Sequence, residues 1–233
     1  KRSGSGFLKK QFSSFTEPYN LLNMKVAKLY NKEKKAVKEI EVKPLVYLYN
    51  SHQTEEYAKT TLAEYAVNPT VTINNYIMLD VFQKNNINTI TEERSIREVL
   101  NLNSWNYAAS YKASRIYMED VKKEYPSLKY FIDLHRDSLK KDKTTIQIGD
   151  KSYAKIIFLI GLENVNYQKN LAFTEEINNK IGEKYPGLSK GIYKKGGDGV
   201  NGVYKQDFSP YTILIEIGGC ENTTSEVLNT VLA

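Results

Sequence analysis

The two histidines of this chain, His52 and His135, are its side chains best suited to metal chemistry. Each lies just past a short apolar run typical of a strand, residues 45–49 before His52 and residues 130–134 before His135. Imidazole is the commonest metal-binding side chain. Two histidines with unrelated structural roles would not be expected to share this position, so the pair predicts one metal site. The alternative is that each histidine is an ordinary core or surface residue.

Glutamates near His52 offer a third ligand. Glu55 and Glu56 follow it closely, and a carboxylate three residues after a histidine can close on the same cation, which favours Glu55. Two histidines and one glutamate, with water in the fourth position, form a known catalytic Zn²⁺ set. Glu56 or a water remains an alternative, and both glutamates could instead be solvated. Cys220 is the only cysteine, which excludes an intrachain disulfide and a cysteine-rich zinc framework.

Glu216 is out of place in the apolar run 212–217, which is otherwise typical of a buried strand. A buried ionised carboxylate costs several kcal/mol unless a cation pairs with it or its pKa rises. Both outcomes suit a general base beside a water that zinc activates, so we expect Glu216 to be catalytic and the chemistry to be amide hydrolysis. The alternative is a salt bridge to Arg136.

Arg136 and Asp137 directly follow His135. We expect Arg136 to bind a substrate carboxylate and Asp137 to orient an imidazole through a hydrogen bond. The alternative is that the two side chains only pair with each other.

Strand-like and helix-like segments alternate along the chain, which predicts an α/β fold. The expected sheet is mostly parallel but mixed, with helices on both faces and the active groups outside the carboxyl ends of the strands. Residues 44–233 would form a single catalytic domain. The expected strands are 45–49, a short run before Thr91, 130–134, 155–160 and 212–217; the expected helices end near 85–86, 124 and 185, the second being long or broken over 93–124.

The positive charge of the chain is concentrated at its start. Residues 1–43 hold eleven Lys or Arg against four Glu, whereas residues 44–233 hold 22 Lys or Arg against 23 acidic residues. We interpret 1–43 as a basic linker or arm, either a solvated tether or a segment that contacts an anionic membrane or wall polymer. No base-stacking motif accompanies the charge, so a nucleic-acid partner is not expected.

Three blocks of the chain, in order, resemble the stage II sporulation protein P family. They are residues 46–55, 132–138 and 214–219, with Asn222 following, and the resemblance spans residues 43–233. This family consists of cell-wall hydrolases of endospore formers and is related to the zinc N-acetylmuramoyl-L-alanine amidases. The resemblance implies an amidase-like fold, with His52 and His135 as metal ligands, Glu55 as the nearby carboxylate and Glu216 as the late catalytic glutamate. We also expect Asn222, like Arg136, to bind substrate.

The resemblance also implies a substrate, a partner and a location. The substrate is peptidoglycan, cut at the amide between the lactyl group of muramic acid and L-alanine and also at peptide cross-links. The partner is a SpoIID-like lytic transglycosylase. The location is extracytoplasmic, at the sporulation septum during engulfment, with a membrane anchor preceding the basic arm. In the wider amidases the ligand glutamate begins the helix after the first strand, where this chain has Asn74 and Asn75. A catalytically silent wall-binding or scaffold module is the alternative.

Overall fold

The six-stranded central sheet of the computed structural model has the strand order β2-β1-β3-β8-β6-β7. The structure describes residues 43–59 and 68–233, so the basic arm predicted for 1–43 lies, apart from Lys43, outside the described residues. Neighbouring strands run parallel except β6 and β8, which are antiparallel. The expected mixed, mostly parallel sheet is thereby confirmed. Its strands are β1 (Val46–Tyr49), β2 (Thr89–Thr91), β3 (Tyr130–Asp137), β6 (Ile156–Gly161), β7 (Ser189–Lys195) and β8 (Thr212–Gly219).

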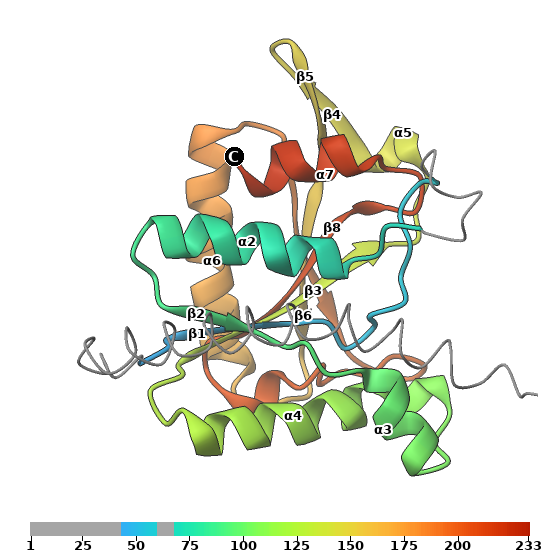
Figure 1. Ribbon diagram of the computed structural model, residues 1–233. Coiled ribbons are helices and arrows are strands. Elements are labelled where there is room, and N and C mark those ends of the chain that lie inside the picture. Colours follow the sequence, from blue (N-terminus) through green and yellow to red (C-terminus); the bar gives the residue numbers. More distant parts are fainter. Residues whose placement is uncertain (1–42, 60–67) are drawn as a thin grey trace, which may run out of the picture. The chain divides into compact units, whose positions relative to one another are not determined.

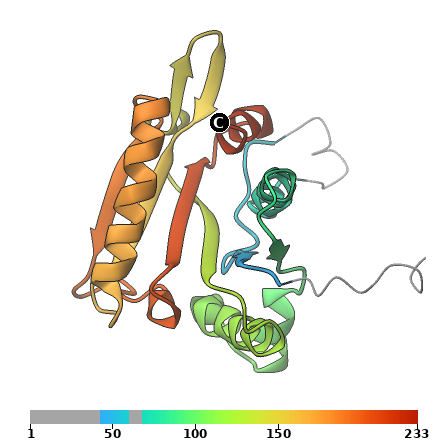
Figure 2. The same ribbon diagram turned by 90° about the vertical axis from the view of Figure 1, so that its left-hand side faces the viewer.

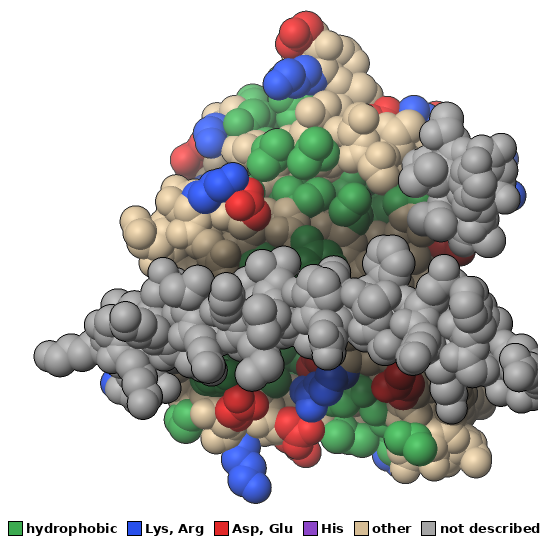
Figure 3. All heavy atoms as spheres, in the orientation of Figure 1, with side chains coloured by type: hydrophobic (Ala, Val, Ile, Leu, Met, Phe, Trp, Pro, Cys, Tyr) green, Lys and Arg blue, Asp and Glu red, His purple; other side chains and the backbone are tan. Residues whose placement is uncertain are grey.

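One face of the sheet carries α2 (Thr72–Lys84), α6 (Tyr167–Lys184) and α7 (Thr224–Val231). Because side chains alternate along a strand, Ile213, Ile215 and Ile217 of β8 all point to this face and join its apolar core. The helices α2 and α7 lie side by side (Figure 1). A pocket of about 380 Å³ lies between these three helices and the isoleucine side chains of the strands. Figure 3 views the side of the molecule that carries α2 and α7, where hydrophobic side chains gather among charged ones.

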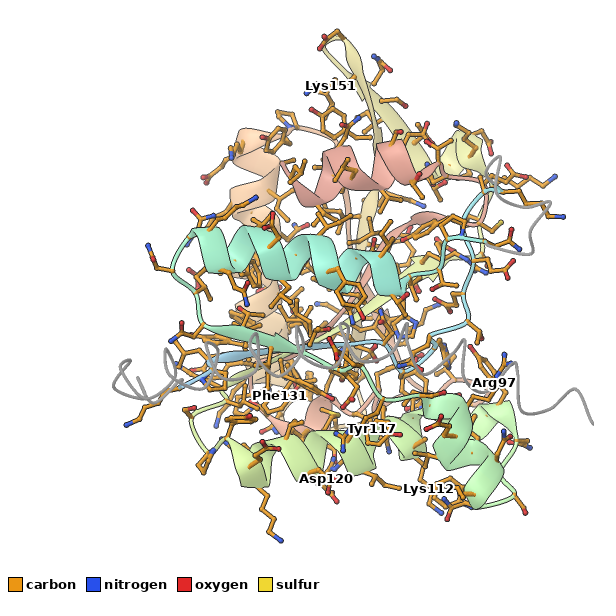
Figure 4. The ribbon with its side chains drawn as sticks, in the orientation of Figure 1. Arg97, Lys112, Tyr117, Asp120, Phe131 and Lys151 are labelled. Carbon is orange, nitrogen blue, oxygen red and sulfur yellow. The ribbon has the colours of Figure 1, made fainter. Side chains whose placement is uncertain are left out.

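The opposite face is covered by α3 (Ile96–Leu102), the 3-10 turn η2 (Tyr107–Ala109) and α4 (Ser110–Glu124), which lie away from α7 in Figure 2. Tyr47, Tyr49 and Phe131 of the sheet pack here against Met118 of α4. Figure 4 shows Phe131 between the sheet and α4. The helix expected over 93–124, long or broken, is broken into α3, η2 and α4. The 3-10 turn η2 begins beside the candidate site.

Several elements were not expected from the sequence. They are the short helix α5 (Lys141–Thr144), the hairpin of β4 (Thr145–Ile148) and β5 (Lys151–Ala154), the edge strand β7, the 3-10 turn η3 (Gln206–Phe208) and the final helix α7. The hairpin packs against α7. Among the described residues, no helix is both long enough and apolar enough to span a membrane.

The strand β3 continues three residues beyond its apolar run, so His135 lies inside the strand and not just after it. This corrects the expected strand end at Leu134. The ladder continues because β8 pairs with β3 as far as Gly219, with a register shift between His135 and Asp137. Gly218 has φ +67°, and a Cβ there would lie 2.7 Å from the side chain of Asn222, so only glycine fits this bend.

Candidate metal centre

The structure brings His52, Glu55 and His135 together at the carboxyl ends of β1 and β3. One possible ligand atom from each residue lies within 4.8 Å of the other two. The Nδ1 atom of His52 is 3.4 Å from Oε1 of Glu55, and Nδ1 of His135 is 3.4 Å from Oε2 of the same carboxylate. Two imidazole nitrogens and a carboxylate oxygen converging in this way suit a Zn²⁺ ion, which binds these donor types.

The loop after β1 is held against β3 by hydrogen bonds that place His52 and Glu55. The side-chain amide of Asn50 donates to the carbonyl oxygen of Leu134 at 2.6 Å, and the backbone N–H of Ser51 donates to Oδ1 of Asp133 at 2.8 Å. The backbone N–H of Glu55 then donates to the carbonyl oxygen of His52 at 3.2 Å, which closes a turn. His52 and Glu55, the two ends of this turn, are thereby both directed at the strand that carries His135.

Asp133 fixes the orientation of His135. The two residues lie on the same face of β3, and Oδ1 of Asp133 is 3.0 Å from Nε2 of His135. The hydroxyl of Ser51 donates to the other Asp133 oxygen at 2.7 Å and lies 2.9 Å from the same Nε2. A carboxylate on the Nε2 side keeps a proton there, so Nδ1, which faces Glu55, is the nitrogen that could bind a metal.

Asp133 and Ser51 contact His135 directly, and the sequence analysis did not single out either residue. Asp137, the predicted orienting carboxylate, accepts instead from the backbone N–H of Leu139 at 3.1 Å. The signal for Asp133 was present, because it is a charged residue inside an apolar strand, two positions before a histidine, just as Glu216 is a charged residue in its own apolar strand. Asp133 is 1% exposed, so its charge must be compensated inside the protein.

The charges around His135 are strongly coupled. Burial lowers the pKa of His135, but the nearby carboxylates of Asp133 and Glu55 outweigh burial and raise it to about 10. Burial likewise raises the pKa of Glu55, but hydrogen bonds from His135, from His52 and from the backbone N–H of Arg136 hold it well below its usual range. A metal ion would therefore have to displace a proton from His135, and it would meet a carboxylate that is already ionised.

Of the two candidate third ligands, the structure directs only Glu55 to the histidines. The carboxylate of Glu56 is exposed and accepts from the side-chain amide of Asn68 at 3.2 Å. Glu56 also forms a backbone bridge with Thr70, which turns it away from the cluster.

Glu216 faces the same site from β8. It is paired in register with His135, so the two side chains lie on the same face of neighbouring strands. Burial, the nearby Asp137 carboxylate and Glu55 raise the pKa of Glu216 to about 7, although His135 opposes the rise. Among the described residues, no hydrogen bond or ion pair engages its carboxylate, so the alternative of a salt bridge to Arg136 is wrong. The guanidinium of Arg136 donates instead to the carbonyl oxygens of Glu56 and Asp137, at 2.8 and 3.3 Å.

Asn222 has a structural position that leaves no side-chain atom for substrate. It is fully buried, and its Oδ1 accepts from the backbone N–H of Gly219 at 2.7 Å. Its Nδ2 donates to Oγ1 of Thr145 at 2.8 Å and to Oε2 of Glu226 at 3.1 Å. The structure therefore gives no support to its expected substrate-binding role and assigns it to the turn after β8.

Two tyrosines that the sequence analysis did not single out pack against His52. Tyr107 of η2 stacks on the imidazole with ring centroids 5.0 Å apart, and Tyr111 of α4 lies at the same centroid distance. The rings of His52 and His135 are themselves 4.9 Å apart. The break between α3 and α4 thus places aromatic rings beside the candidate ligands, and nothing in the sequence pattern signalled it.

The model of the stage II sporulation protein P (SpoIIP) family matches residues 9–233. The chain belongs to the SpoIIP family. Stage II sporulation protein P of Bacillus subtilis (strain 168) is 34% identical over 193 residues, which cover 79% of this chain and 48% of that protein. The chain thus spans about half the length of this SpoIIP relative. The match begins well before β1, so most of the basic segment falls within the SpoIIP family region.

Solved structures give weaker likenesses to this SpoIIP chain. Cwp6 from Clostridium difficile has a TM-score of 0.43 at 14% identity, covering 81% of this chain and 27% of that one. The CwlD amidase from Clostridioides difficile, solved in complex with the GerS lipoprotein, has a TM-score of 0.46 at 10% identity, covering 80% of this chain and 92% of that one. At these scores neither structure assigns an activity.

Proposed function

We propose that this SpoIIP-family chain is a zinc-dependent peptidoglycan hydrolase that cuts the amide between muramic acid and L-alanine. One observation carries the proposal: three residues of the types found in catalytic zinc sites have ligand atoms within 4.8 Å of one another, and Glu216 lies in register with His135 on the next strand, with no hydrogen bond or ion pair to any described residue. Residues 44–233 would be the catalytic domain.

The residues that would hold Zn²⁺ are His52, Glu55 and His135. When bound, zinc lowers the pKa of a water to about 7 and polarises the scissile carbonyl. Asp133 and Ser51 keep the Nε2 proton of His135 in place, so that its Nδ1 is the atom available to bind the metal. These contacts make the donor set rigid before substrate arrives.

Glu216 would act as the proton carrier of the reaction. Its carboxylate accepts a proton from the attacking water and delivers it to the nitrogen of the leaving amine. The bond from the lactyl carbonyl carbon to nitrogen breaks, a bond from that carbon to the water oxygen forms, and the products are a lactyl carboxylate and a free L-alanyl amine. A pKa near 7 lets one group serve both steps at neutral pH.

The biological setting belongs to the same proposal. Membership of a sporulation family supports action in wall remodelling during sporulation. Attachment to the membrane at the septum, cleavage of peptide cross-links and cooperation with a SpoIID-like lytic transglycosylase are expectations that we carry forward from the sequence.

Mass spectrometry of digested peptidoglycan tests the proposed activity. We expect the zinc-loaded chain to release stem peptides with a free L-alanyl amine, and we expect the release to stop with a chelator or in His52→Ala. Dimers split between peptides, with intact muramoyl amides, would replace the amidase proposal by an endopeptidase. Wall binding with no product from zinc-loaded protein would favour a scaffold.

A further inference from the structure

A second pocket, of about 290 Å³, lies directly beside the metal centre. Its walls come from the loop after β1, from the start of α3 and from Tyr107. The link to the candidate metal centre is direct, because Ser51 precedes the His52–Glu55 turn, Thr54 lies within it, and Tyr107 stacks on His52. A substrate held at the candidate ligands would therefore extend past Tyr107 into this pocket.

The pocket is already formed in the structure. Gln53 joins its two sides, because its Nε2 donates to the carbonyl oxygen of Arg94 at 2.8 Å and its Oε1 accepts from the backbone N–H of Ile96 at 2.8 Å. Ile96 and Leu100 are buried and give the pocket an apolar wall. With loop and helix fixed to each other, little ordering is needed when a ligand enters.

Arg97 at the rim differs from the other arginines that the structure describes. Arg94 is paired with Glu92 and Asp120, and Arg115 is paired with Glu119 and Asp207. The guanidinium of Arg136 is bound to backbone carbonyl oxygens.

Within the described ranges, Arg97 alone among the arginines has neither an ion pair nor a hydrogen bond, and it is exposed. Figure 4 shows it on α3. An unpaired guanidinium beside a reaction centre is suited to bind a carboxylate through two parallel hydrogen bonds.

We propose that this pocket is the subsite for the first two residues of the stem peptide, with Arg97 as the residue that recognises a carboxylate. The inference rests on the proposed function. The residue after the scissile amide is L-alanine, whose methyl group suits the wall of Ile96, Leu100 and Tyr107. The next is a γ-linked D-glutamate, whose free α-carboxylate would meet Arg97. The volume lies near the lower end for ligand sites, so it suits a dipeptide and leaves the glycan outside.

Binding of the product dipeptide tests the subsite without requiring catalysis. L-alanyl-D-glutamate with its γ-carboxyl capped as an amide, which leaves only the α-carboxylate free as in the stem peptide, and the analogue with both carboxyls as amides are titrated into the zinc-loaded chain by calorimetry or NMR. We expect the acid to bind about tenfold more tightly than the amide, the scale of a charge-assisted hydrogen bond. In Arg97→Gln the acid should lose this advantage, while the amide should bind as it does to the wild type.

A matched control is Lys112→Gln, which removes a nearby cation outside the pocket, where Lys112 covers the ring of Trp105. This variant should keep the full preference for the acid, and Arg97→Lys should keep part of it. Equal binding of acid and amide by the wild type, no binding of either, or an unchanged preference in Arg97→Gln overturns the subsite.

The assay also separates the subsite from the catalytic proposal. If Arg97-dependent binding occurs but no muramoyl amide is cleaved, the subsite stands and the proposed hydrolase fails. If cleavage occurs and the acid has no advantage, the hydrolase stands and the subsite fails.

Discussion

The two carboxylates that flank His135 come from opposite sides of the site, and the protein treats them in opposite ways. Glu55, from the loop after β1, is held by two histidines and a backbone N–H, which keep its pKa low. Glu216, from β8, has no such partner among the described residues, and burial raises its pKa to about 7. The difference separates a fixed, permanently ionised group from one that can gain and lose a proton near neutral pH.

Local backbone structure explains this contrast. Glu55 lies in a turn, where backbone N–H groups and the side chains of two strand ends converge on it. Glu216 lies within a paired strand, where the backbone groups bond to neighbouring strands and cannot reach its carboxylate. The turn therefore holds its carboxylate ionised, whereas the strand holds a carboxylate whose charge is only partly compensated.

The largest expected effect is on catalysis, from Glu216→Gln. This change removes the proton acceptor and keeps the shape, so we expect kcat to fall by about 10²–10⁴-fold. Zinc content should not change, because Glu216 is outside the donor set. Steady-state cleavage of a muramoyl peptide, with metal analysis of the same sample, measures both. Unchanged kcat at full zinc content would remove Glu216 from the mechanism.

In the zinc-free protein, the same variant should also change how thermal stability depends on pH. The pKa of Glu216 is raised on folding from 4.5 to about 7, so the fold is favoured while the group is protonated and loses this contribution as pH rises through 7. At pH 8, Glu216→Gln should therefore have a higher Tm than the wild type, and at pH 4 the gap should close. Calorimetry at the two pH values checks the sign.

Metal affinity gives the next largest effect and separates Glu55 from Glu56. We expect Glu55→Gln to weaken zinc binding by more than about 100-fold, because losing a ligand exceeds the roughly 10–100-fold cost of losing an outer partner. Glu56→Gln is the matched control, one residue away and exposed, and it should bind zinc as the wild type does. Competition with a fluorescent chelator measures both. The reverse order would make Glu56 the ligand.

The sequence predicted the parts of the site that stand out from an apolar background. His52, His135 and Glu216 were found because each is a polar residue within or beside a strand pattern, and Glu55 because of its spacing from His52. Asp133 fits the same pattern but was not predicted. It lies two positions before His135 on the same face of β3, whereas the orienting role was expected of Asp137, after His135.

Roles that depend on tertiary partners could not be read from the chain. The sequence gives no sign of what the side chains of Arg136 and Asn222 bind. In the structure, the guanidinium of Arg136 donates to backbone carbonyl oxygens, and the side-chain amide of Asn222 is hydrogen-bonded within the turn after β8. The strand β7, with several lysines and only two large apolar residues, lacks the run that marks a strand, because it is paired on one side only. The hairpin and α7 are short elements fixed by contacts with each other.

The smallest expected effect concerns a third carboxylate, Glu226, which shows that a lowered pKa alone does not mark a ligand. Burial would raise the pKa of Glu226, but the ammonium of Lys141 and hydrogen bonds from Thr223, Asn222 and Ser152 lower it from 4.5 to about 2. These partners join α7 to α5, to the hairpin and to the turn after β8. We expect Glu226→Gln to reduce the free energy of unfolding by about 1–3 kcal/mol at pH 7, with unchanged zinc affinity.

The pH dependence of that loss distinguishes the charge of Glu226 from its shape. Because its folded pKa is depressed, the stabilisation is complete above about 4.5 and disappears as pH falls towards 2, where wild type and Glu226→Gln should converge. Glu176→Gln is the control: it removes an exposed partner of Lys180, and surface pairs of this kind contribute about 0–1 kcal/mol. Urea unfolding at pH 7 and pH 3 measures the three proteins. A Glu226→Gln deficit that stays constant with pH would assign the effect to packing, and a loss of zinc affinity would place α7 within the metal centre and erase the contrast between structural and ligand carboxylates.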